Sequence, residues 1–88
     1  MRRSKNQKQI LLQELEELLE RLTIPLRYEK GNFKGGLCFY NEKAYFIINK
    51  NLSLDQKLQI FRNDLLHVNL EDLFIRPAIR EFLSNPHF

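Results

Sequence analysis

Hydrophobic residues near the start of the chain recur every three or four positions, the spacing of an amphipathic helix. Ser4 and Gln7 have the spacing of a capping box, and Pro25 disfavours helical backbone at the residue before it. We therefore predict a helix over residues 4–22, with its leucine stripe in the core or, alternatively, in a homodimer contact. The stripe consists of Leu11, Leu12, Leu15, Leu18, Leu19 and Leu22.

The middle of the chain has the alternation and turn residues of β-structure. Apolar and polar residues alternate over 24–29, turn residues follow at 30–32, and two further strand-like segments lie at 37–40 and 44–48. A short connection at 41–43 joins the last two segments as a hairpin. Residues 44–48 are apolar on both faces, so we expect this strand to be the best covered. The pattern predicts a three-stranded, mainly antiparallel β-meander.

A second helical pattern opens at Ser53, which has capping-box spacing to Gln56. We expect this helix to end or bend at residues 69–70, and Pro77 to open a final helix that reaches about residue 83. The predicted order is α-β-β-β-α-α, an α+β fold with helices on one face of the sheet. The buried stripe of the second helix is Leu54, Leu58, Phe61, Leu65 and Val68.

The 88 residues predict one domain over residues 9–84. Residues 1–8 form a basic tail or the start of the first helix, and residues 85–88 form a C-terminal tail. Cys38 is the single cysteine, which excludes an intrachain disulfide. The chain has neither the apolar core of a signal peptide nor a run of about 20 apolar residues. We expect a cytoplasmic protein with no membrane contact.

The net charge of +3 is unevenly distributed. The first eight residues carry four cations and no acid, whereas the other 80 carry ten basic and eleven acidic side chains. Cations and aromatic residues also interleave over residues 27–50, which is typical of surfaces that stack single-stranded bases. Nucleic-acid binding is therefore one hypothesis, and a solvated tail with aromatic residues in the core is the other. The candidate binding residues are Arg2, Arg3, Lys5, Lys8, Lys30 and Lys34.

Three features invite chemical interpretations. Gly35 and Gly36 do not belong to a phosphate-binding motif, so we expect them to permit a turn, a bulge or positive φ. Cys38 lies in an apolar strand, where we expect a buried, inert thiol. Asp64, His67 and Glu71 cluster opposite the apolar stripe if the second helix continues, and could bind zinc or another divalent cation. A solvated polar face explains the same pattern without a metal.

Several segments together resemble the minimal zincin core of the ImmA/IrrE-type metallopeptidases. A leading helix ends in the sequence ELLERLTIP at residues 17–25, a Gly-Gly segment follows, and residues 44–53 (AYFIINKNLS) lead directly into a helix. In that family, a strand ending in I-N-x-x-L-S precedes the helix that carries HExxH. The similarity spans about residues 12–68. The pattern is also similar to that of small bacterial proteins with no assigned activity.

The resemblance implies a scaffold that lacks the family's catalytic set. The HExxH segment here reads Asn63-Asp64-Leu65-Leu66-His67. The motif requires two zinc-binding histidines and a glutamate base, but Asn63 takes the first ligand position and the shorter Asp64 takes that of the base. Only His67 matches the motif.

We therefore expect a non-catalytic protein that acts through contacts with a protein partner or with itself. Nucleic-acid binding and metal-dependent hydrolysis through Asp64, His67 and Glu71 are the alternatives.

Overall fold

The computed structural model describes the backbone of residues 2–71 and 73–84, and the side chains from residue 7 within these ranges. The element order is α-β-β-β-α-α, which confirms the predicted α+β class. The elements are α1 (Arg2–Arg21), β1 (Leu26–Glu29), β2 (Gly35–Tyr40), β3 (Lys43–Asn49), α2 (Leu54–Leu65) and α3 (Pro77–Ser84).

The sheet is mixed, with the strand order β1-β3-β2. Strand β3 pairs in parallel with β1 and antiparallel with β2, so the predicted meander is wrong. The alternating pattern identified three strands, but it contained no information on which strands are neighbours. The central position of β3 agrees with its apolar character on both faces, and Phe46 and Ile48 are fully buried.

The loop between β1 and β2 crosses the end of β3 and is held there by Asn49. This side chain is only 8% exposed. Its Nδ2 donates to the carbonyl oxygens of Gly31 and Phe33, each at 2.7 Å, and its Oδ1 accepts from the Asn51 N–H at 3.0 Å. The loop carbonyls are thus satisfied by a buried amide, as buried polar groups require.

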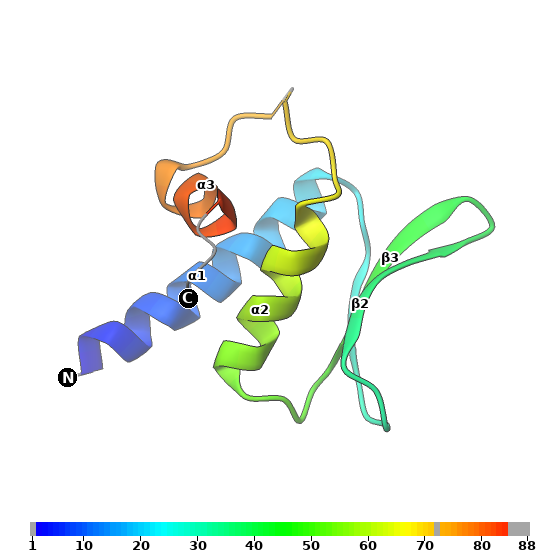
Figure 1. Cartoon of the computed structure of the whole chain (residues 1–88), viewed down its shortest axis with the longest axis horizontal. Helices are drawn as coiled ribbons and strands as arrows, with labels where there is room; N and C mark the ends of the chain where they lie inside the picture. The colour runs from blue at the N-terminus through cyan, green and yellow to red at the C-terminus, as the bar shows by residue number, and fades with distance from the viewer. Residues whose placement is uncertain (1, 72, 85–88) are drawn as a thin grey trace.

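Helices α1 and α2 lie on the same side of the sheet, and α3 packs against them on the side away from it (Figure 1). The Phe46 and Phe61 rings stack between β3 and α2, with centroids 4.8 Å apart. Leucines of α1 complete this core, which confirms the predicted stripe of the first helix. The buried apolar residues are Leu15, Leu18, Leu19, Phe46, Ile48, Leu58, Phe61, Leu65, Ile75, Ile79 and Leu83.

Two expectations about the helices need correction. Helix α1 begins at Arg2, so Ser4 lies inside it and is not its N-cap. In the α1 stripe, Leu15, Leu18 and Leu19 are buried, and the other three leucines are partly buried against the same core. Helix α2 ends at Leu65, before the predicted boundary, which leaves Val68 outside the helix. The Ser53–Gln56 capping box is present as predicted.

Within the described residues, no helix combines the length and the apolar character that crossing a membrane requires.

Candidate functional site

The candidate metal-binding residues do not share a helical face. Because α2 ends at Leu65, His67 lies in the following turn, where it is exposed. Glu71 lies in a later turn, and its N–H donates to Asn69 Oδ1 at 3.0 Å. Among the described residues, no three His, Cys, Asp or Glu side chains are grouped as a metal site would require. The alternative in which Asp64, His67 and Glu71 cluster on one face of the second helix is therefore wrong.

Asp64 instead binds the outer edge of the sheet. Its Oδ2 accepts a hydrogen bond from the Leu37 N–H in β2 at 2.6 Å. The same oxygen would lie 2.3 Å from a Cβ atom at Gly36, so only glycine permits this approach. A carboxylate committed to a backbone amide, beside the exposed side chains of Asn63 and His67, does not fit a zinc site.

The two strand glycines adopt the positive φ that the sequence predicted. Gly35 has φ +113° and Gly36 has φ +141°. A Cβ at Gly35 would lie 2.0 Å from the Ile47 carbonyl oxygen, so a side chain is excluded there as well. The paired glycines let β2 approach both β3 and the Asp64 carboxylate closely.

Strand β2 is an edge strand with outward-facing backbone groups. The Asn49 N–H donates to the Lys34 carbonyl at 3.0 Å, and residue 34 is the next partner of 49 in the β2–β3 register. Since direction alternates along a strand, Gly36 and Cys38 also face β3, whereas Leu37 and Phe39 direct their N–H and C=O groups outward. The Leu37 N–H donates to the Asp64 carboxylate. In the described part of the chain, nothing accepts the Phe39 N–H.

The face of the sheet opposite the helices carries an apolar and aromatic surface. Phe46 and Ile48 point into the helical core, so their neighbours Tyr45 and Ile47 point to the other face, where they are half-buried. Cys38 pairs with Tyr45 across the strands and shares this face. We call this surface the uncovered face. Its apolar and aromatic residues are Cys38, Tyr40, Tyr45 and Ile47, and the cations Arg27 and Lys43 share it as the cross-strand partners of Ile47 and Tyr40.

Cys38 is exposed, so the predicted buried thiol is wrong. Its apolar neighbours in sequence suggested burial, but the helices cover only one face of the sheet. The thiol Sγ lies 3.6 Å from the Gly36 carbonyl oxygen, to which it donates.

The hairpin between β2 and β3 projects beyond the helices (Figure 1). Its end bears the most prominent aromatic residues of the strands, with Phe39 72% exposed and Tyr40 68% exposed. The turn residues Asn41 and Glu42 both have positive φ, +52° and +64°. This combination defines a type I′ turn, which favours glycine at the second position rather than glutamate.

The predicted nucleic-acid residues are distributed over separate elements. Lys8 on α1 forms an ion pair with Asp55 at 2.9 Å, whereas Lys30 and Lys34 lie exposed at the β1–β2 loop. Arg2, Arg3 and Lys5 belong to α1, but their side chains lie outside the described residues. The interleaved aromatic residues are divided too, because Phe46 is buried in the core while Tyr45 lies on the uncovered face.

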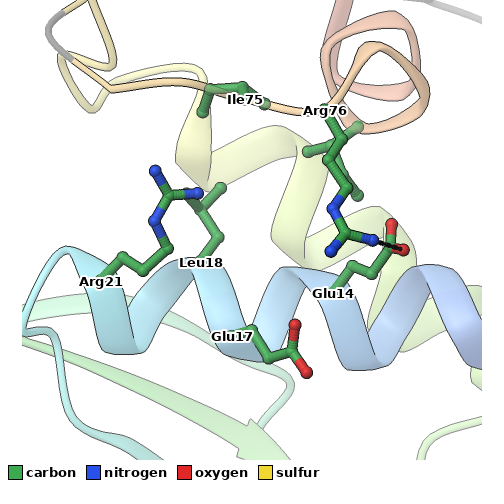
Figure 2. A pocket seen from close by; sticks show the side chains of 7 residues that line it. Glu14, Glu17, Leu18, Arg21, Ile75 and Arg76 are labelled. Carbon is green, nitrogen blue, oxygen red and sulfur yellow. Dashed lines mark hydrogen bonds and ion pairs between the residues drawn. The ribbon is translucent and has the colours of Figure 1, made fainter.

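Two concave sites along α1 were not expected from the sequence. One of about 120 Å³ lies between α1 and the segment before α3, where Arg76 pairs with Glu14 at 2.9 Å (Figure 2). Its other lining residues are Glu17, Leu18, Arg21, Ile75 and Ile79.

The other, a groove of about 670 Å³ between α1 and β1, contains Glu16, Glu17 and Glu20. The Tyr28 hydroxyl donates to Glu16 in this groove. Burial, together with this hydrogen bond and the nearby negative charge, raises the pKa of Tyr28 well above its usual value. These acids lie on α1 outside its leucine stripe.

No family model matches the chain, and the comparisons with curated proteins and with solved structures found no match either.

Proposed function

We propose that the protein is a non-catalytic protein-binding module, and that its binding surface comprises the uncovered face and the adjoining β2–β3 hairpin. The observation that carries this proposal is the one-sided covering of the sheet. Tyr45 and Ile47, at the centre of the sheet, lie on the side that neither α1 nor α2 covers.

Strand β3 pairs in parallel with β1, and the strands of parallel sheets are normally covered on both faces and apolar on both. Here the central strand has Phe46 and Ile48 on the covered side, and Tyr45 and Ile47 on the other side. A partner that packs on the uncovered face would remove these side chains from water, and each Å² of apolar surface buried contributes about 25 cal/mol.

The composition of the hairpin supports the same conclusion. Aromatic residues are enriched at protein interfaces because they bury a large area at a low cost in conformational entropy. Phe39 and Tyr40 are both more than two-thirds exposed at the projecting end of the hairpin. Tyr40 belongs to the uncovered face, whereas Phe39, the cross-strand partner of Ala44, points to the other side of the projecting hairpin.

The exposed thiol of Cys38 is consistent with a cytoplasmic location, where free cysteines remain reduced. The resemblance to the ImmA/IrrE-type scaffold stays a prediction. The use of Asp64 to bind β2 supports the non-catalytic part of that prediction, because the carboxylate at the position of the base already has a structural partner.

Photocrosslinking in the native host tests the proposed surface. We would replace Tyr45 with p-benzoylphenylalanine and compare it with the same residue at Gln59, an exposed position on α2. We expect a protein adduct after irradiation at position 45 and none at position 59. No adduct at position 45, or equal adducts at both positions, would contradict the proposal.

Nucleic-acid binding is the alternative to be tested in parallel. A binder that uses cations would lose affinity steeply as salt is raised. A titration with random single-stranded RNA at low and physiological salt separates this alternative from protein binding.

A further inference from the structure

The outer edge of β2 has the chemistry of a strand-addition site. Leu37 and Phe39 direct their backbone groups away from β3, and among the described residues the Phe39 N–H has no acceptor. An edge strand with unpaired backbone groups and exposed aromatic residues is a template for another strand. This inference rests on the proposed protein-binding function and addresses which chain occupies the edge.

The charges at the two ends of β2 favour a second copy in antiparallel orientation. Lys34 precedes the strand and Glu42 lies in the turn after it, and neither has an ion-pair partner in the part of the chain that the structure describes. In an antiparallel pair, the start of each β2 meets the end of the other. Lys34 of one copy then approaches Glu42 of the second copy, and the contact occurs twice. A parallel pair would bring like charges together instead, which is unfavourable.

One register satisfies both the charges and the direction of the backbone groups. With the two-fold axis at Cys38, residue 34 lies opposite residue 42 of the second copy. Leu37 then lies opposite Phe39 of the second copy, and both residues direct their backbone groups outward, as a hydrogen-bonded pair requires.

Asp64 competes with this pairing. Its Oδ2 accepts from the Leu37 N–H at 2.6 Å, which is the position that the Phe39 carbonyl of the second copy would take. The carboxylate must leave this N–H before the second strand can pair fully. Asp64 thus guards the edge in the single chain, as natural edge strands are commonly guarded.

The turn residue Glu42 provides a second, independent observation. Its φ of +64° is unfavourable for a residue with a Cβ atom, and glycine would avoid the strain. Strained residues of this kind concentrate where the side chain has a role beyond folding. A contact with Lys34 of a second copy would give Glu42 such a role.

We propose that two copies of this chain pair antiparallel through their β2 edges about a two-fold axis at Cys38. The pairing produces a continuous six-stranded sheet with the helices of both copies on one side. The two uncovered faces then join on the other side into a single larger surface.

Disulfide trapping tests the register. Cys38 of the two copies would occupy a non-hydrogen-bonded site with Cα atoms about 4.5 Å apart, within the range of about 4.4–6.8 Å for a disulfide. Diamide, which accepts the two thiol hydrogens, is expected to link the native copies rapidly. In the matched control, Tyr40→Cys with Cys38→Ser, the two cysteines are four residues out of register, or about 13 Å apart. The proposal would be overturned if the native chain and the control variant formed disulfide-linked dimers at equal rates, or if neither formed them.

Sedimentation equilibrium tests the hydrogen bonds. Phe39→Pro removes the outward N–H without removing a bond to β3, and Phe39→Ala is its control because it retains the N–H. We expect the proline variant to dissociate about tenfold to a hundredfold more readily than the alanine variant. Asp64→Ala is expected to associate more tightly than the native chain. Circular dichroism verifies that each variant is folded. A native chain and an Asp64→Ala variant that both remain monomeric up to sub-millimolar concentration would overturn the proposal.

Photocrosslinking at position 45 and disulfide trapping at Cys38 together separate the self-pairing from the proposed protein-binding function. An adduct at position 45 with twice the chain mass supports self-pairing. An adduct of another mass, with no Cys38 link, retains the protein-binding function but overturns the self-pairing. Absence of both the adduct and the link overturns both.

Discussion

Replacement of Asn49 by alanine tests how the strand order is held. The Asn49 side chain makes three hydrogen bonds that connect the end of β3 to the β1–β2 loop and to Asn51. Each contributes about 0.5–1.5 kcal/mol, and the freed loop carbonyls of Gly31 and Phe33 can bind water because both residues are exposed. We therefore expect Asn49→Ala to lower the free energy of unfolding by about 2–3 kcal/mol.

Urea unfolding followed by circular dichroism measures this loss. For a chain of this size the urea dependence is about 1–1.5 kcal/mol per M, so the midpoint is expected to fall by about 2 M. Lys50→Ala is the matched control, because Lys50 is an exposed neighbour whose backbone N–H, not its side chain, bonds to Glu29. A loss below about 0.5 kcal/mol for Asn49→Ala would refute the assigned role, since ordinary surface substitutions have effects of that size.

Three further substitutions test other parts of the structure. Ser53→Ala removes the side-chain acceptor of the α2 capping box and should cost about 1 kcal/mol in chemical unfolding, with Gln59→Ala as an exposed comparison on the same helix. Glu42→Gly relieves the positive φ and should raise the free energy of unfolding of the single chain by about 0.5–1 kcal/mol; a loss of stability would contradict the strain argument. The raised pKa of Tyr28 means that the folded state holds the phenol proton more tightly, so its contribution is present below the unfolded pKa of about 10 and lost at higher pH. Tyr28→Phe should therefore lose more stability at about pH 8 than at about pH 11, and an equal loss at both pH values would exclude this linkage.

The sequence predicted the elements of this fold better than their arrangement. Helical periodicity, the Ser53 capping box and Pro77 are local signals, and the structure confirms the elements that they indicate. The insertion of β3 between β1 and β2 is not a local property, because a loop over residues 30–34 suits a hairpin and a crossover equally well. The Asn49 side chain bonds to the carbonyls of this loop only when β3 lies between β1 and β2, so it indicates the crossover only once the fold is known.

The early end of α2 explains the errors at the predicted site. The apolar stripe extends in the sequence to Val68, but the helix stops at Leu65, so His67 and Glu71 do not lie on the helix opposite this stripe. Asp64 was singled out only as a possible metal ligand and as the residue at the position of the base. Its partner, the Leu37 N–H, lies 27 positions away in sequence and could not be found from spacing.

The uncovered face was missed for a related reason. An apolar strand segment such as residues 44–48 is equally consistent with cover on one face or on both. Only the position of α1 and α2 on the same side shows that Tyr45 and Ile47 lack cover within the described chain. The exposure of Cys38 follows from the same asymmetry.

The most direct test of the account is amide hydrogen exchange at Phe39, measured by NMR over a series of protein concentrations. In the single chain this N–H points outward without an acceptor among the described residues, so it should exchange rapidly at low concentration. The account predicts that its protection rises with concentration as a second copy pairs with the edge, while the amide of Ile48, in the central strand, stays protected throughout. Rapid exchange of the Phe39 amide at every concentration would contradict the account.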